Sequence, residues 1–182
     1  MVLIIVGAVL VLIVLYVIGA YNGMVKLRNK VKTNWSQIDV VLKRRADLIP
    51  NLVETVKGYA SHEKETLDRV IKARNSYVSA STPEAQMASS GELTQALSRL
   101  MMLSEAYPDL KANTNFIDLQ ETLKTTEDKI QFARQFYNDS VYEYSNKIES
   151  FPANIIAGMF QFKPFTLFET EAADREVPKV SF

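Results

Sequence analysis

Apolar residues follow two successive patterns along this chain, a continuous run at the N-terminus and then a helical repeat. From Val2 to Tyr21 the sequence reads VLIIVGAVLVLIVLYVIGAY, and the first charged side chain after it is Lys26. A helix of about 20 apolar residues spans the ~30 Å hydrocarbon core of a bilayer. The run is therefore predicted to be a transmembrane anchor covering residues 1–21.

A cleaved signal peptide is the alternative interpretation of this run. Such a peptide carries a basic segment before an apolar run of about 7–15 residues. No Lys or Arg precedes the run here, and Ile18-Gly19-Ala20 is only a weak cleavage site. An uncleaved anchor is favoured.

Basic residues are concentrated just after the apolar run. Residues 26–60 hold eight basic and three acidic side chains, a net charge of +5, and the following residues carry −5. The positive-inside rule then predicts a single-pass protein of the bacterial inner membrane, with its N-terminus outside and its C-terminal domain cytoplasmic. The expected membrane-interface residues are Tyr16, Tyr21, Lys26, Arg28, Lys30 and Lys32.

From Leu27 onward, apolar residues recur every three or four positions, which predicts amphipathic helices. The first stripe runs from Leu27 to Tyr77 and ends before Ser81. It keeps its phase across Pro50, so a kinked but continuous helix is favoured there over a reversal of the chain.

Two further helices are predicted. Thr82 has the character of an N-cap with Pro83 after it, so a helix over Glu84–Glu105 is expected, weakened in its first half by Ser89-Ser90-Gly91. The helix over Phe116–Phe151 has the alternating spacing of coiled-coil-like packing. The predicted fold class is all-α, with the transmembrane helix continuing into an elongated antiparallel bundle of three to four long helices.

The bundle is predicted to occupy residues 22–150, followed by an aromatic-rich tail over residues 151–182. The tail holds six of the nine phenylalanines, Phe151, Phe160, Phe162, Phe165, Phe168 and Phe182. One interpretation is that the tail folds back and packs on the bundle. The alternative is a contact with the membrane interface or with another protein, which aromatic side chains also favour.

A self-association surface is predicted from the length of the first helix. If this helix continues through Pro50 it outreaches its partners, and its stripe from Leu27 to Ile38 has no intrachain cover. Such a stripe is typical of a contact with another copy of the chain. The candidate oligomer interface comprises Leu27, Val31, Trp35, Ile38, Phe160, Phe162, Phe165 and Phe168.

Charged residues also fall on or beside the apolar stripes. They are Arg45, Glu63, Arg74, Glu127 and Arg134. The favoured interpretation is a set of interhelical polar contacts that fix the register of the bundle. The alternative is a pocket for a ligand or partner lined by these side chains.

The composition excludes several kinds of site. The chain has no cysteine, so it has no disulfide, zinc ribbon or thiol nucleophile. Its 21 basic and 21 acidic residues argue against a nucleic-acid binder. His62-Glu63 begins like an HExxH zinc motif, but Thr66 stands where the second histidine is needed and His62 is the only histidine. We expect no metal, no cofactor and no enzymatic activity.

Several stretches of the sequence resemble the LemA family of bacterial membrane proteins. They are Tyr21–Glu63, which contains RRADLIPNLVETVKGY, then Tyr107–Gln120, Thr126–Val141, FPANIIAGMF at Phe151–Phe160, and the C-terminal VPKVSF. The resemblance implies a single-pass anchor and an antiparallel helical bundle. Some relatives are thought to contribute to membrane compartments in magnetotactic bacteria, and others occur alongside membrane-bound zinc metalloproteases. The family has no established enzymatic activity, so the resemblance implies no catalytic residues.

The leading hypothesis for function is a membrane-anchored, non-enzymatic helical scaffold that self-associates and organises membrane or partner proteins. Its expected partners are the lipid bilayer and further copies of the chain, and nucleic acid is not among them. The alternative is an adaptor or regulatory subunit of a signalling complex or of a membrane protein such as a protease.

Overall fold

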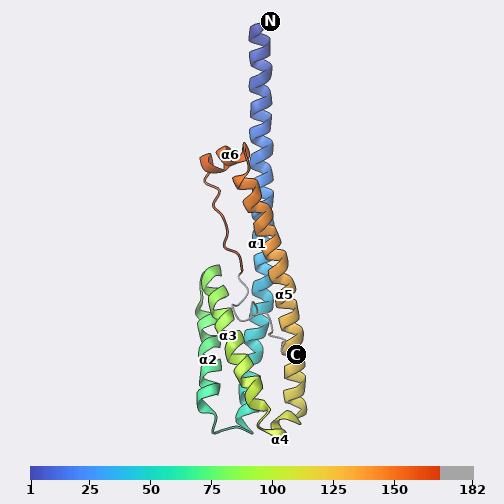
Figure 1. Cartoon of the computed structure of the whole chain (residues 1–182), viewed down its shortest axis with the longest axis vertical. Helices are drawn as coiled ribbons and strands as arrows, with labels where there is room; N and C mark the ends of the chain where they lie inside the picture. The colour runs from blue at the N-terminus through green and yellow to red at the C-terminus, as the bar shows by residue number, and fades with distance from the viewer. Residues whose placement is uncertain (169–182) are drawn as a thin grey trace, which may run out of the picture. The chain divides into compact units, whose positions relative to one another are not determined.

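The computed structural model describes residues 1–168, and every regular element within that range is a helix (Figure 1). The helices are α1 (Val2–Lys57), α2 (Lys64–Ser79), α3 (Pro83–Ser104), α4 (Pro108–Lys111), α5 (Thr114–Glu149) and α6 (Ala153–Met159). The predicted all-α fold is confirmed. Residues 169–182 of the predicted tail, including Phe182 and VPKVSF, lie outside the described residues.

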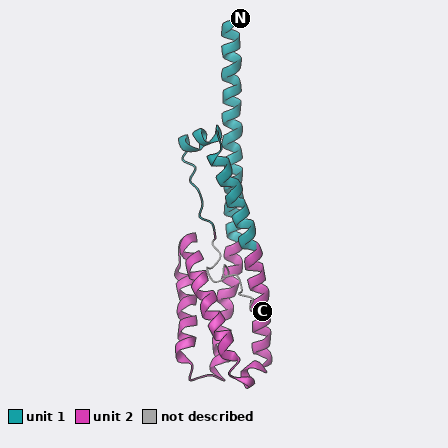
Figure 2. Cartoon of the chain, in the orientation of Figure 1, with its two compact units in different colours: residues 1–37, 133–167 teal, residues 38–132, 168–182 magenta. Residues whose placement is uncertain are grey.

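The chain forms two compact units, and the long helices α1 and α5 each contribute to both (Figure 2). Unit 1 consists of residues 1–37 and 133–167, and unit 2 of residues 38–132 and 168–182.

Helix α1 continues through Pro50, as the unbroken phase of its stripe predicts. Proline has no N–H to donate to the carbonyl oxygen of Ala46, one turn earlier. In its place, Nε of Arg74 on α2 donates to that oxygen in a long hydrogen bond of 3.5 Å. Ile49 and Leu52, on either side of the proline, are both buried in the core of unit 2. Packing and this side-chain donor therefore help to hold the helix together at Pro50.

The prediction that this helix extends to Tyr77 is wrong, because the chain turns between residues 58 and 63. The N–H of Gly58 still donates to the oxygen of Glu54 at 3.3 Å, but α2 does not begin until Lys64. The apolar period persists across the turn because residues on both sides of it, Val56 and Leu67 among them, enter the same core.

The core of unit 2 draws apolar side chains from five helices. They include Leu52 and Val56 of α1, Val70 of α2, Leu93 and Leu100 of α3, Leu110 of α4, and Phe116 and Leu123 of α5. Helix α3 begins as predicted, with Pro83 in its first turn and Oγ1 of Thr82 accepting a hydrogen bond from the N–H of Ala85 at 3.2 Å.

In unit 1 the apolar stripe of α1 packs against α5. Met24 and Val31 are buried, and the ring of Trp35 meets the ring of Tyr137 edge-on, with 5.5 Å between centroids. Nδ2 of Asn34 donates to the backbone oxygen of Phe136 at 3.0 Å.

The prediction that the stripe from Leu27 to Ile38 lacks intrachain cover is therefore wrong. Val31 is 1 % exposed, Leu27 and Trp35 are half-buried, and Ile38 is fully buried within unit 2. The physical reason is the length of α5, whose 36 residues run far enough to cover the stripe. The argument for self-association through this stripe loses its basis.

Replacing Pro50 by alanine is expected to stabilise the protein by about 2 kcal/mol, because an interior proline costs up to ~3 kcal/mol and the looser unfolded chain offsets part of the gain. Arg74→Met is expected to cost about 1 kcal/mol in the natural sequence and less when combined with Pro50→Ala, since the alanine N–H then bonds to Ala46. Thermal unfolding of the four proteins by circular dichroism measures this coupling. Additive effects of the two substitutions would show that Arg74 does not compensate for the proline.

Candidate functional site

Arg45 of α1 lies at the centre of a polar cluster that joins three helices of unit 2. Its Nη1 donates to Oε2 of Glu127 on α5 and to Oγ1 of Thr94 on α3, both at 2.8 Å. Its Nη2 donates to the backbone oxygen of Ser90 at 3.0 Å and to the hydroxyl of Ser90 at 2.7 Å. The side chain of Arg45 is 1 % exposed, whereas that of Glu127 is 31 % exposed. The two form a half-buried ion pair in which only the carboxylate reaches water.

The small residues of α3 make this arrangement possible. Ser89 and Ser90 are buried, and the helix runs through them without interruption. A buried guanidinium is strongly destabilising unless hydrogen bonds and an opposite charge compensate it. Here the terminal nitrogens are fully engaged, and the Nε N–H has no acceptor within the described residues. The Ser89-Ser90-Gly91 segment therefore accommodates the arginine.

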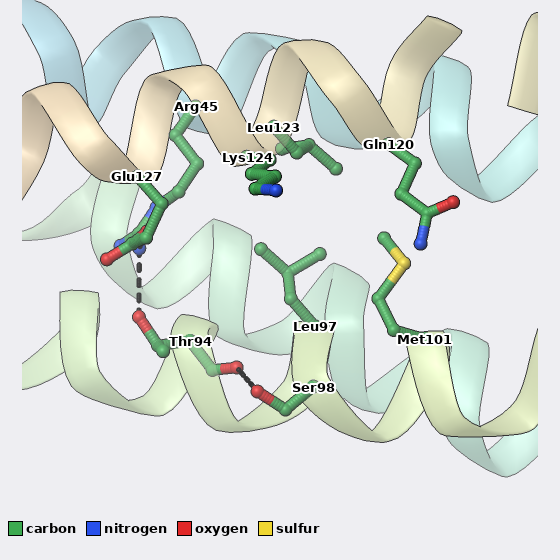
Figure 3. Close-up of a pocket in the computed structure, with 9 residues that line it drawn as sticks. All are labelled: Arg45, Thr94, Leu97, Ser98, Met101, Gln120, Leu123, Lys124 and Glu127. Atoms are coloured by element: carbon green, nitrogen blue, oxygen red, sulfur yellow. Dashed lines mark hydrogen bonds and ion pairs between the residues drawn. The ribbon is translucent and has the colours of Figure 1, made fainter. Parts of the chain in front are cut away.

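A pocket of about 470 Å³ opens beside this cluster. Figure 3 shows Leu97 and Met101 projecting from one helix toward Leu123 on another, with Arg45 and Glu127 grouped to one side. The remaining lining residues are Thr94, Ser98, Gln120 and Lys124. The space suits a small, largely apolar group with one polar end. Within residues 1–168, no group of three or more His, Asp or Glu side chains is placed to hold a metal ion.

The five charged residues singled out from the sequence do not form one site. Arg45 and Glu127 are joined directly. Glu63 accepts a hydrogen bond from the hydroxyl of Tyr107 at 3.0 Å, and Nε of Arg74 donates to the backbone oxygen of Ala46. Arg134 is half-buried on the part of α5 that belongs to unit 1. The Arg45–Glu127 pair fits the interpretation of an interhelical contact better than that of a charged pocket.

The predicted membrane-interface residues of α1 lie in unit 1. The ring of Tyr21 meets the rings of Phe160 and Phe162 edge-on at centroid distances of 4.8 and 5.6 Å. The guanidinium of Arg28 lies 5.2 Å from the centroid of the Phe162 ring. Tyr21 and Arg28 are thus partly engaged within the chain, and Nζ of Lys30 donates to Oε2 of Glu143 on α5 at 2.7 Å. Tyr16, Lys26 and Lys32 are exposed.

The N-terminal part of α1 is not covered by any other part of residues 1–168. Its large apolar side chains from Val2 to Ile18 are all exposed except that of Val17, which is half-buried. The first buried residue is Ala20. By length and composition this segment is able to cross a membrane, and none of its most apolar window is buried.

The sequence model of the LemA family matches residues 34–182. The chain belongs to the LemA family. Protein LemA of Metamycoplasma hominis is 24 % identical over 162 residues, which cover 87 % of this chain and 73 % of that protein.

Two magnetosome proteins are similar to this LemA family chain. Magnetosome protein MamQ 2 of Paramagnetospirillum magneticum is 24 % identical over 179 residues, covering 84 % of this chain and 66 % of the relative. Magnetosome protein MamQ of Magnetospirillum gryphiswaldense is 23 % identical with the same coverage. The chain thus spans about two thirds of the length of these proteins. Together with the uncovered apolar helix, these relationships support a membrane-associated protein of the LemA type.

Another polar contact of this LemA family chain was not predicted from its sequence. The buried hydroxyl of Tyr77 on α2 donates to Oδ1 of Asp39 on α1 at 3.2 Å. Burial and the neighbouring Asp39 carboxylate raise the pKa of the Tyr77 hydroxyl well above its usual range. Tyr77 lies on the predicted apolar stripe, but its partner on a second helix becomes evident only once the two helices pack.

Glu127→Ala is expected to destabilise the protein by about 3 kcal/mol, because it leaves the Arg45 charge buried without its carboxylate. Arg45→Met is expected to cost less, about 1–2 kcal/mol, because Glu127 can turn to water and methionine fills the vacated space. At roughly 2–4 °C per kcal/mol, the difference is measurable as separate Tm values of the detergent-solubilised full chain. Equal losses, or a greater loss for Arg45→Met, would contradict this account of the pair.

Stability is expected to fall above about pH 10, partly through Tyr77. Its pKa is raised in the folded protein, so the neutral hydroxyl contributes stability that is complete below the unfolded pKa of ~10 and is lost as the pH rises toward the folded value. Tyr77→Phe removes this pH-dependent contribution to the unfolding free energy, which changes by at most ~1.4 kcal/mol per pH unit. Unfolding free energies between pH 8 and 11 should therefore decline less steeply in the variant. Tyr142→Phe, at an exposed position, should retain the natural slope, and identical slopes for Tyr77→Phe and the natural protein would refute the assignment.

Proposed function

We propose that this LemA family protein is a membrane-anchored, non-enzymatic helical scaffold that associates with further copies of itself through the outward side of α5. The bundle is proposed to lie in the cytoplasm, since Lys26, Arg28, Lys30 and Lys32 directly follow the apolar segment. The proposal replaces the stripe of α1 as the contact surface, because that stripe is covered within the chain.

The observation that carries the proposal is an aromatic pair on the solvent side of α5. Phe132 and Phe136 are 63 % and 61 % exposed and follow each other by one helical turn. Residues four apart on a helix share a face. Ile130 and Tyr137, on the inward side of α5, are buried. Exposed aromatic side chains that cluster in this way favour a protein contact.

The contacts in the polar cluster of unit 2 support a structural role for the charge of Arg45. Both terminal nitrogens of Arg45 are engaged by protein acceptors on α3 and α5. An arginine so occupied is poorly available to a substrate, and a bundle whose helices are tied together in this way suits a platform.

Self-association is tested with the double variant Phe132→Ser/Phe136→Ser. The natural chain in detergent is expected to have an oligomeric mass by light scattering, and the variant a monomeric mass with an unchanged helical spectrum, since both side chains are exposed. Ile71→Ser/Val78→Ser is a matched control, because it removes two exposed apolar side chains from α2. A monomeric natural chain, or an oligomer insensitive to the α5 substitutions, would exclude this scaffold and favour an adaptor that binds a different protein.

The cytoplasmic location is tested separately with Ser98→Cys, an exposed position in a chain without native cysteine. A membrane-impermeant thiol reagent is expected to label this variant only after the cells are permeabilised. Labelling in intact cells would place the bundle on the other side of the membrane.

A further inference from the structure

Helix α6 and its flanks form an uncharged segment in unit 1. Residues 150–162, SFPANIIAGMFQF, contain no charged side chain. One side of α6 packs inward, since Ala153, Ile156 and Ala157 are all at most 5 % exposed. A segment of this length on the surface of a bundle ordinarily carries charge on its outer side.

The outer side of α6 carries a row of large apolar side chains instead. Phe151, Ile155 and Met159 are 80 %, 56 % and 73 % exposed. Ile155 and Met159 are four residues apart on α6 and therefore share one face of the helix. The exposed Phe151 lies just before the helix begins. This row has no intrachain cover among the described residues, so contact with water leaves it unfavourably hydrated.

A capped turn fixes α6 beside α1. Gln161 adopts φ 54°, the N–H of Phe162 donates to the oxygen of Ala157 at 2.9 Å, and the N–H of Gln161 donates to Gly158 at 3.2 Å. This is the Schellman arrangement that closes a helix C-terminus. It returns Phe162 to the interior, against the ring of Tyr21.

The contact with Tyr21 sets the level of α6 along α1. Tyr21 ends the apolar run, and the neighbouring residues Ala20 and Met24 are the first buried positions of the helix. In unit 1, α6 lies beside α1 where the uncovered apolar segment gives way to packed protein (Figure 2). The exposed row of α6 therefore adjoins the surface that lipid is expected to cover.

Basic side chains lie near the contact between α6 and Tyr21. Lys26 follows Tyr21 on α1, the side chain of Lys147 on α5 lies close to Gly23, and the exposed Lys163 follows the α6 turn. Such residues favour the anionic headgroups of a bilayer surface. An uncharged apolar row flanked by lysines is the pattern of an interfacial helix.

We propose that α6 is an interfacial element, whose row of Phe151, Ile155 and Met159 inserts into the headgroup–acyl boundary of the same bilayer that α1 spans. The inference rests on the membrane anchoring in the proposed function and adds a second point of contact. With lipid on both α1 and α6, the first buried turn of α1 is held at the membrane surface.

The experiment uses single-cysteine variants of the full chain in nanodiscs of phosphatidylcholine and phosphatidylglycerol. Ile155→Cys and Met159→Cys each receive an environment-sensitive fluorophore, and spin-labelled lipids with the label at the headgroup or at acyl carbon 5 act as quenchers. We expect both lipids to quench both α6 positions at least twofold. Gln135→Cys, at an exposed position of α5, is the control in the same unit. Its neighbour Phe136 accepts a hydrogen bond from Asn34, about 20 Å along α1 from Tyr21, so a label at residue 135 should not be quenched.

A further variant, Leu10→Cys, separates the inference from the anchor on which it rests. Quenching at Leu10 with none at Ile155 and Met159 would overturn the interfacial role of α6 and leave the anchor intact. Because Leu10 lies near the middle of the apolar run, its quencher is a lipid labelled at acyl carbon 12, and absence of quenching by that lipid would overturn the anchor itself. Labels on α6 that are shielded from aqueous iodide but not quenched by lipid would show a protein contact there and would also overturn the inference. Retention of the natural helical spectrum verifies that each variant is folded.

Discussion

Helix α1 combines an apolar segment that suits lipid with a segment that packs against the rest of the protein. The rest of the structure depends on how α1 joins these two environments. Over its first turns the helix is apolar on every side and uncovered, which suits an environment of lipid. From Ala20 onward the apolar residues narrow to a stripe, and protein covers that stripe up to the end of the helix. Since backbone hydrogen bonds are satisfied within a helix, the change of solvent requires no break in the chain.

Covering the stripe determines the architecture of both units. Within unit 1 the cover comes from the C-terminal half of α5 and from α6 with the aromatic residues after it. Within unit 2 it comes from four further helices, and there a charge is buried with the apolar side chains. Arg45 is accommodated because α3 presents small hydroxyl residues at that level and α5 presents a carboxylate. The cluster stabilises one alignment of three helices, which a purely apolar core would specify less strongly.

Much of this fold was predictable from periodicity, since the uncovered apolar helix at the N-terminus, the passage through Pro50, the cap at Thr82 and the extent of α5 follow from local rules. The turn at Gly58 was missed because in-phase apolar residues on both sides of it enter one core. The burial of Val31 under α5 was missed because the lengths of the helices were predicted without knowing which helices pack against each other. Of the candidate site, Arg45 and Glu127 were recognised, whereas Ser90 and Thr94 were not. A serine in a helix carries no sign in the sequence that a guanidinium will lie against it.

In the proposed function, this LemA family protein is a bundle held at a membrane by its first helix, with an aromatic surface on α5 for further copies of the chain. This function requires α1 to be a single rigid helix between the lipid and the packed protein. The most direct test is the distance between spin labels at Leu10→Cys and Lys32→Cys in nanodiscs, both within unit 1. A continuous helix predicts one narrow distribution near 33 Å, from 1.5 Å per residue. A broad distribution, or a distance well short of this value, would contradict the account.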